Sequence, residues 1–489
     1  MRNLNFPEDA DIIGENGNGF TLKGKNHIEI NPRYFAAKLL KRYRLIFFTR
    51  DGWYEWSTAG WVPARKCVIK SRISDLLLEE VRAYSNTKKN LLPLPKSKGA
   101  SEPAYDLVST RSINEIMSML AISCDHGDTL PPLDPDVIPV QNGVLRWNEE
   151  TQDFDFQDHY TPNDLIFTRL NVVYDPNADM KFFLDRLAEI LPDVEDQRVV
   201  QECFGAAVFV ENHTRKFLLL QGEGGCGKSI LVEFLTRILT WERTFDLDFK
   251  SLHGNYAFSA LTTQTLLTAS EAVSEAFCQS AGIEFVKKAV GGDFFATSQK
   301  YRNQKVGHHG LYSLIIVSNN KLKFKYDGRG DEFKDRLIPI LFSHHIENRN
   351  LTLIDTLMRD HRSAFLNWLL DGARRVRRNN WDITLSDTQI NRRDRLVEAT
   401  HGIELFVENN VEDYETGHIT TDDAYRRYVY YHKTAGYEYM EYTVFQKRFA
   451  KAMAKCFGDV TCKNLPSPDG KNNARGYRGV RLKENQNIN

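Results

Sequence analysis

The chain has 489 residues, which is long enough for two to four domains that each bury a core of their own. Its hydrophobic content of 42% and charged content of 26% are those of an ordinary globular protein. The formal net charge of −1 excludes a protein coated in positive charge, although it leaves room for local basic patches.

The amino-terminal region, residues 1–130, is expected to be a mixed α+β domain, and its sequence does not indicate a role. Residues 29–70 are rich in aromatic and β-branched side chains, with turns at Asp51-Gly52 and Ala59-Gly60. This pattern predicts a small β-meander.

Helices are expected to follow the meander, from Ile69 to Tyr84 and within residues 105–130. Between them, Lys88–Pro103 carries Lys, Ser, Gly and Pro residues, so it is the best candidate for a linker or loop.

Four further regions follow in the chain. We expect a helical collar, an α/β ATPase core with a parallel sheet, a helical segment with a linker, and a carboxyl-terminal domain. An arginine run at 374–378 is read as a solvated helix end. The expected bounds are 131–210 for the collar, 211–345 for the core, 346–394 for the helical segment and 395–489 for the last domain.

The most specific motif is a G-x-x-x-x-G-K-S loop between an apolar run, Phe217–Leu220, and a helical pattern, Ile230–Leu239. Glycines allow backbone N–H groups to surround phosphates, the lysine reaches the β- and γ-phosphates, and the serine hydroxyl can hold Mg²⁺. The sequence therefore predicts a site for ATP and Mg²⁺. Its residues are Gly222, Glu223, Gly224, Gly225, Cys226, Gly227, Lys228, Ser229 and Ile230.

Three later residues complete a candidate catalytic set with Lys228. Glu271 follows a β-rich run and is the candidate for polarising water beside Mg²⁺, with a surface glutamate at a strand end as the alternative. Asn319 follows the buried-strand pattern of residues 314–318, where an amide can contact the γ-phosphate or form a local turn. Arg336 precedes an apolar strand and can stabilise charge on a transferred phosphoryl group, although alone it reads as an ion-pair residue.

Two segments are candidates for nucleic-acid contact. Residues 298–309 alternate basic, aromatic and amide side chains and favour a hairpin, with a solvated charged loop as the alternative. Residues 442–481 predict an amphipathic helix, a turn-rich loop and a basic strand, which look like a winged-helix module or a helical cap with a basic surface. The candidate DNA contacts are Lys300, Tyr301, Arg302, Lys305, His308, Lys447, Arg448, Lys451 and Arg478.

The order of these motifs resembles that of the superfamily 3 helicases. Within them the chain is similar to the phage and plasmid primase-helicase group, which includes the poxvirus primase-helicase. Supporting segments are Asn142–Leu145, Tyr174–Pro176, Gln201–Gly205 and Lys287–Asp293. The resemblance covers roughly residues 130–345.

This resemblance implies an AAA+-type core and an ATP-driven DNA helicase that translocates on single-stranded DNA. It implies that Glu271 activates water, that Asn319 senses the γ-phosphate, and that Arg336 reaches into a neighbouring subunit of a hexameric ring. Expected partners are single-stranded and forked DNA, further copies of the chain, and a separate primase or polymerase. The alternative is a replication initiator or loader that binds origin DNA without processive unwinding.

Two features depart from the family pattern. Cys226 stands where asparagine is common, and its thiol is expected to ionise easily beside a lysine and a helix N-terminus. Residues 1–130 show no zinc-binding set and no convincing cluster of metal-binding carboxylates, so the sequence gives no basis for predicting primase activity. No apolar run of signal or membrane-spanning length is present, which favours a cytoplasmic protein, in the host if a phage encodes it.

Overall fold

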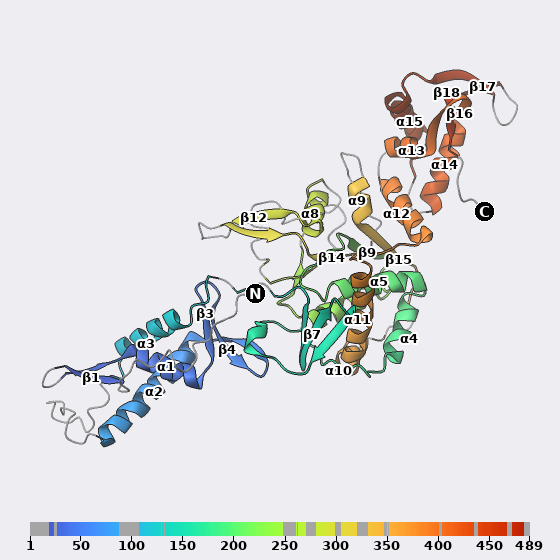
Figure 1. The fold of residues 1–489 in the computed structure, drawn as a ribbon. Helices are drawn as coiled ribbons and strands as arrows, with labels where there is room; N and C mark the ends of the chain where they lie inside the picture. The colour runs from blue at the N-terminus through green and yellow to red at the C-terminus, as the bar shows by residue number, and fades with distance from the viewer. Residues whose placement is uncertain are drawn as a thin grey trace. The chain divides into compact units, whose positions relative to one another are not determined.

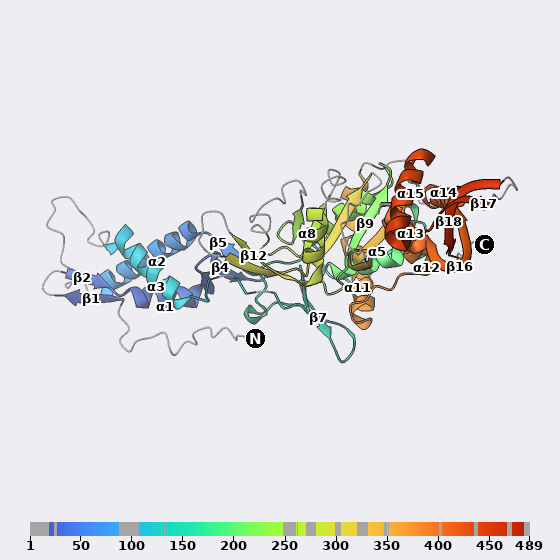
Figure 2. The ribbon, with the colours of Figure 1, turned by 90° about the horizontal axis from the view of Figure 1, so that it is seen from above.

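The computed structural model describes most of the chain, and two compact units divide it. The first unit contains residues 1–134, 141–146 and 156–169, and the second contains 135–140, 147–155 and 170–489. Figures 1 and 2 show the ribbon. The described residues are 19–23, 27–87, 107–128, 130–131, 133–247, 261, 263–269, 280–298, 305–319, 331–346, 350, 352–400, 403–434, 439–466 and 472–483.

The first unit packs three helices against a three-stranded antiparallel sheet of order β3-β4-β5. The helices lie beside one another in Figures 1 and 2 and bury aliphatic side chains against the sheet. A two-stranded antiparallel ribbon, β1-β2, precedes them. The elements are β1 Phe20–Lys23, β2 His27–Ile30, α1 Pro32–Arg42, β3 Leu45–Phe48, β4 Gly52–Ser57, β5 Gly60–Ala64, α2 Lys66–Thr87 and α3 Thr110–Ser123.

The predicted meander is present as β3-β4-β5, but extending it back to residue 29 was wrong because α1 occupies Pro32–Arg42. The signal for this helix is local. The Asn31 side chain accepts hydrogen bonds from the backbone N–H groups of Arg33 and Tyr34, and Pro32 stands at the first helical position. Asparagine and proline favour these two positions at a helix start.

The segment expected to be a helical collar begins with strands. It contains β6 Val137–Val140, β7 Gly143–Asn148 and β8 Asp153–Gln157 before α4 Lys181–Ile190 and α5 Val194–Ala206. Only its second half is therefore helical, and the chain passes between the two units five times from residue 134 to residue 170.

The second unit is built on a five-stranded, entirely parallel sheet of order β10-β11-β14-β9-β15. Its central strands are buried along almost their whole length, as expected for a parallel sheet covered on both faces. Its elements are β9 Phe217–Gly222, α6 Lys228–Leu239, β10 Thr244–Asp246, β11 Leu266–Ala269, α8 Ser280–Gly291, β14 Ser313–Ser318, α9 Asp331–Arg336 and β15 Leu337–Phe342. The sheet confirms the α/β class predicted for this region.

An antiparallel hairpin connects α8 to β14. It consists of β12 Phe294–Ser298 and β13 Lys305–His309, and it extends away from the sheet in Figure 1. A hairpin was expected within residues 298–309; its second strand lies there, but its first strand begins earlier, at Phe294.

Helices after the sheet tie the second unit together. They are α10 Leu353–Asp360, α11 Arg362–Arg378 and α12 Asp387–Thr400. At the crossing of α11 with α5, Gly205 faces the backbone of Gly372 and Ala373, and a Cβ on Gly205 would lie 2.3 Å from the Ala373 nitrogen. Glycine at this crossing lets the two helix backbones approach closely.

The arginine run on α11 is not a solvated helix end, so that expectation was wrong. Arg377 is 9% exposed and pairs with Asp136 and Glu149. Its guanidinium also lies 5.1 Å from the Trp147 ring centroid and 5.2 Å from that of Trp381. These contacts join α11 to the segment of β6 to β8 that belongs to the same unit.

The carboxyl-terminal part has a hydrophobic core of its own. Helices α13, α14 and α15 pack against an antiparallel sheet of order β16-β18-β17, with Phe406, Phe445 and Phe449 at the centre of the core. The elements are α13 Ile403–Asn410, β16 Val411–Thr420, α14 Thr421–Thr434, α15 Tyr442–Phe457, β17 Thr461–Pro466 and β18 Asn472–Leu482.

Among the described residues, the helices are all too short or too polar to cross a bilayer. The same part of the chain contains no cluster of three or more His, Cys, Asp or Glu side chains that could hold a metal ion.

Candidate nucleotide site at the sheet edge

The candidate site lies where β9 ends and α6 begins, at the carboxyl edge of the parallel sheet. Gly225 and Gly227 adopt positive φ angles of 92° and 84°, which non-glycine residues rarely adopt. A Cβ on Gly227 would also lie 2.8 Å from the Ile190 side chain. The glycines therefore fix the loop backbone that connects the buried strand to the helix.

Lys228 is the first residue of α6, and its side chain turns back over the loop. Its Nζ donates to the carbonyl oxygens of Gly222 and Glu223, both at 2.7 Å. Burial lowers the pKa of Lys228, because removing the ammonium from water disfavours its charged form, while nearby Cys226 opposes this shift. The ammonium is therefore held against the first two residues of the loop and is poorly solvated.

The neighbouring residues differ in exposure. Ser229 is exposed at the first turn of α6, so its hydroxyl is available to a ligand. Cys226 is only 2% exposed, which leaves its thiol little access to reagents in spite of its position beside Lys228.

The strand register places Asn319 beside this loop. β14 pairs with β9 so that Ser318 lies opposite Gln221, and Asn319, the next residue, is exposed. Ligands of open α/β sheets bind at the carboxyl ends of the strands. β11, which precedes Glu271 in the chain, is the other neighbour of β14, but Glu271 itself lies outside the described residues.

Arg336 lies at the amino-terminal ends of the parallel strands, whereas the loop lies at their carboxyl ends. It immediately precedes β15, whose first residue, Leu337, pairs with Phe217 at the start of β9, whereas the loop follows Gly222 at its end. The five residue steps along β9 span about 17 Å at roughly 3.3 Å each. The structure therefore separates Arg336 from the loop of its own chain.

The Arg336 guanidinium is held by two contacts. It donates to the backbone oxygen of Lys287 on α8 and to Glu332, one turn earlier on α9. The Lys287 ammonium also pairs with Glu332 at 2.5 Å, and the hydrogen bond from this lysine, despite opposing desolvation, lowers the pKa of the carboxyl.

Gly291 leaves the space that this guanidinium occupies. A Cβ on Gly291 would lie 2.2 Å from Nη1 of Arg336. In the sequence, Gly291 stands out only as part of the Lys287–Asp293 segment. Its contact with Arg336 depends on how α8 packs beside α9, which no local pattern reveals.

The candidate DNA contacts fall in two places. Lys305 and His308 lie in β13, opposite Ser298 and Phe295 on β12. Lys300, Tyr301 and Arg302 lie outside the described residues.

In the carboxyl-terminal part, Lys447, Arg448 and Lys451 are exposed on α15, on the side away from buried Phe445 and Phe449. Arg478 is exposed on β18. The structure thus brings the three α15 cations onto one helix face.

Comparisons with known proteins give two partial family matches. Residues 34–192 match the family model described as D5 N terminal like. Residues 220–336 match a family of unknown function, DUF5906. The first match agrees with the primase-helicase resemblance inferred from the sequence, and neither covers half of the chain.

Solved structures give distant likenesses. The apo structure of the NrS-1 C terminal region (305–718) has a TM-score of 0.47 at 12% identity, covering 92% of this chain and 99% of that one. An A form apo structure of the same region has a TM-score of 0.43 at 12% identity, covering 92% and 100%. These scores do not establish a shared fold. A search of curated proteins found no match.

Proposed function

We propose that this protein is an ATP-dependent, ring-forming DNA helicase of phage or plasmid replication that translocates on single-stranded DNA. The observation that carries the proposal is the separation of Lys228 and Arg336 at opposite edges of one parallel sheet. A P-loop at one edge and an arginine at the other suit a site completed by the next copy of the chain.

The residues at the loop fit Mg²⁺ and ATP. The loop N–H groups and Lys228 would hold the phosphates, and the Ser229 hydroxyl would be an oxygen ligand of Mg²⁺. When bound, Mg²⁺-ATP supplies the phosphoryl group that is transferred to water. Glu271 would accept a proton from that water, and Asn319 would orient it without adding charge.

The hairpin β12–β13 and the basic face of α15 supply the proposed DNA contacts. Single-stranded DNA is bound through its phosphates by cations and through its bases by aromatic rings. Lys300, Arg302 and Lys305 would serve the first purpose in the hairpin, and Tyr301 and His308 the second.

A replication initiator or loader is the second candidate. The exposed cations of α15, on a compact module with its own core, favour it because such a helix could read duplex origin DNA. A forked duplex separates the two functions. A helicase displaces the strand in the presence of ATP, whereas an initiator hydrolyses ATP on DNA and leaves the fork paired.

The shared site is tested by mixing Lys228→Ala with Arg336→Ala. Each variant alone should lose at least about a hundredfold of its ATPase activity, since each lacks a group that stabilises phosphate charge. Mixed copies can place an intact loop beside an intact arginine, so activity should return in part. Arg359→Ala, an exposed arginine paired with adjacent Asp360, is the control. No recovery at any mixing ratio contradicts the shared site.

A further inference from the structure

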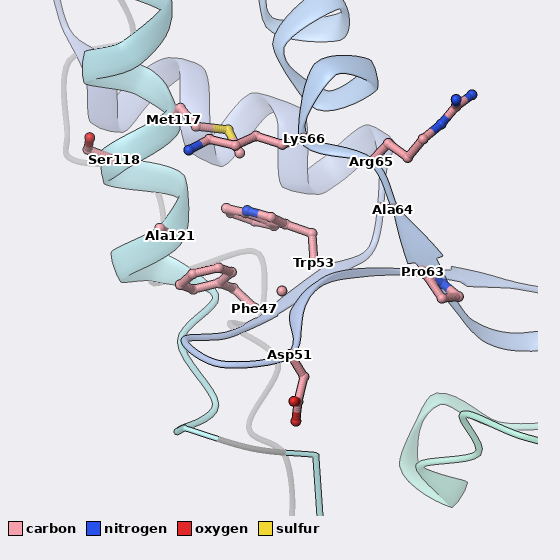
Figure 3. A pocket seen from close by; sticks show the side chains of 11 residues that line it. Phe47, Asp51, Trp53, Pro63, Ala64, Arg65, Lys66, Met117, Ser118 and Ala121 are labelled. Atoms are coloured by element: carbon pink, nitrogen blue, oxygen red, sulfur yellow. The ribbon is translucent and has the colours of Figure 1, made fainter. Parts of the chain in front are cut away.

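The first unit contains a pocket of about 460 Å³ that the proposed ATPase does not use. Its floor is a row of cross-strand neighbours, Phe47 on β3, Trp53 on β4 and Ala64 on β5, which face the same side of the sheet. Met117 and Ala121 of α3 form a wall, and the volume lies in the range of small-molecule sites. Figure 3 shows these side chains around the opening.

The pocket is mainly apolar and aromatic. The Phe47 and Trp53 rings pack together with centroids 4.7 Å apart, and Trp53 is only 7% exposed. The wall is fixed to the floor because the Phe47 N–H donates to the Cys124 oxygen at the end of α3, at 2.8 Å. The cavity therefore belongs to a packed scaffold.

The rim is positively charged. Arg65 ends β5 and Lys66 begins α2, and Figure 3 shows the Lys66 side chain reaching across Trp53 toward α3, with Arg65 pointing outward. Within the part of the chain that the structure describes, neither side chain has a hydrogen bond or an ion pair. Three other cations of this unit, by contrast, are paired with carboxylates: Lys38 with Glu80, Arg42 with Glu79 and Arg72 with Glu55.

Among the described residues that line the pocket, Asp51 is the one with a carboxylate, and this carboxylate is directed away from the two cations. Asp51 accepts a hydrogen bond from the Leu130 N–H at 2.6 Å, and in Figure 3 its carboxylate points away from the Trp53 ring. The pocket thus combines an aromatic floor with two rim cations, Lys66 directed toward α3 and Arg65 directed outward. A planar apolar group attached to an anion matches this arrangement.

We propose that this pocket binds one nucleotide unit of single-stranded DNA, with the base against the aromatic floor and its phosphates at Lys66 and Arg65. Bases contact aromatic side chains regardless of sequence, and the backbone supplies the anion. The pocket would be a second binding site for single-stranded DNA, outside the ATPase core. It requires neither Lys228 nor ATP hydrolysis, so its failure is distinct from failure of the helicase proposal.

The test cross-links the full-length protein to an oligothymidylate that carries 5-iodouracil. Cross-linked peptides are expected to contain residues 45–66 or 117–121. Lys66→Glu should remove these cross-links and weaken binding at least about fivefold, because it replaces a cation at the phosphate with a negative charge. Ala121→Phe fills the pocket without changing charge and should remove them as well.

Arg33→Glu is the matched control. Arg33 is exposed on α1, belongs to the same unit, and does not line the pocket. Equal affinities of Lys66→Glu and Arg33→Glu, or cross-links confined to other parts of the chain, would overturn the proposal. Pocket cross-links formed by free 5-iodo-2′-deoxyuridine monophosphate but not by the oligothymidylate would assign the site to a free nucleotide and reject the strand. Melting curves of each variant exclude loss of folding as the cause.

Discussion

Gly291 shows how much depends on one missing side chain. Arg336 lies against α8 at the point where any larger residue would displace its guanidinium, because a Cβ would come within 2.2 Å of Nη1. The same glycine ends the helix that leads into the hairpin β12–β13. One residue therefore constrains both the arginine and the base of the proposed DNA-binding element.

Gly291→Ala is expected to reduce DNA-stimulated ATPase activity at least about tenfold, because a displaced Arg336 would not reach its proper position. Nucleotide affinity should stay within about twofold of the original value, since the loop after β9 is unaffected. Steady-state turnover and binding of a fluorescent ATP analogue measure the two quantities. Parallel losses of affinity and turnover would indicate a general collapse of the domain and would contradict this reading.

The sequence predicted those features of the site that depend on consecutive residues alone. The loop around Lys228 is defined by consecutive residues, and the structure has the positive φ angles at Gly225 and Gly227 that its glycines suggest. Only one of the two partners of Arg336 could be predicted from the sequence. Glu332 precedes it by one helical turn, but the Lys287 oxygen comes from a different helix.

Helix α11 depends on distant parts of the chain, because its arginines connect it to strands more than two hundred residues earlier. Arg374 donates to Asp153 on β8, and Arg377 lies among Trp147, Phe209 and Trp381. A run of arginines at a helix end is usually solvated, so composition alone favoured the wrong interpretation. The acidic partners are far away in sequence and carry no motif. At α1 the local sequence did contain a helix-start signal, Asn31-Pro32. The aromatic and β-branched content of the region favoured strands instead, so the helix was not predicted.

Arg377→Ala should destabilise the second unit by about 2–4 kcal/mol, because it removes a nearly buried cation from two carboxylates and from aromatic faces. The matched change Arg359→Ala, at a 70% exposed side chain, should cost less than about 0.5 kcal/mol. Calorimetric melting of both variants compares them. Equal melting temperatures would show that the α11 contacts are dispensable.

The Asp153 carboxyl provides a pH test of another α11 contact, the ion pair between Asp153 and Arg374. Burial raises its pKa, but the hydrogen bond and charge of Arg374, with the Phe154 N–H, outweigh this and lower it. A carboxyl with a lowered pKa contributes stability above its ordinary pKa and loses it as pH falls through the lowered one. The gap in melting temperature between the original protein and Asp153→Asn should therefore be largest near pH 7 and shrink below about pH 4. A gap that stays constant over this range would exclude the contact as its source.

The chain passes repeatedly between the two units, and this determines where the molecule can be divided into domains. Residues 135–140 and 147–155 belong to the second unit although they precede part of the first. In the first unit, the backbone N–H of Trp61 donates to the Ile166 oxygen at 2.9 Å, and its indole N–H donates to the Pro162 oxygen. The domain boundary expected near residue 130 therefore does not separate two independent stretches of chain. Composition could not reveal this, because the exchange depends on which segments pair in space.

Two fragments test whether residues 135–169 contribute to the stability of the second unit. A fragment that begins at Pro135 keeps Asp136, Glu149 and Asp153 for the α11 arginines, whereas one that begins at Leu170 loses all three. The shorter fragment should melt several degrees lower and be less soluble, because buried cations lose their partners. Identical melting of the two fragments would show that residues 135–169 add nothing to the second unit.

This interleaving also limits how such a protein can be reshuffled by recombination. A single crossover near residue 134 would join an amino-terminal unit to strands and acidic partners selected for a different one. A new amino-terminal unit can be acquired intact only if the crossover lies beyond residue 169, so that all segments of both hydrophobic cores stay with their own partners or are replaced together. We therefore expect natural exchange of this unit to carry the whole stretch up to Arg169, with compensating changes at the arginines of α11.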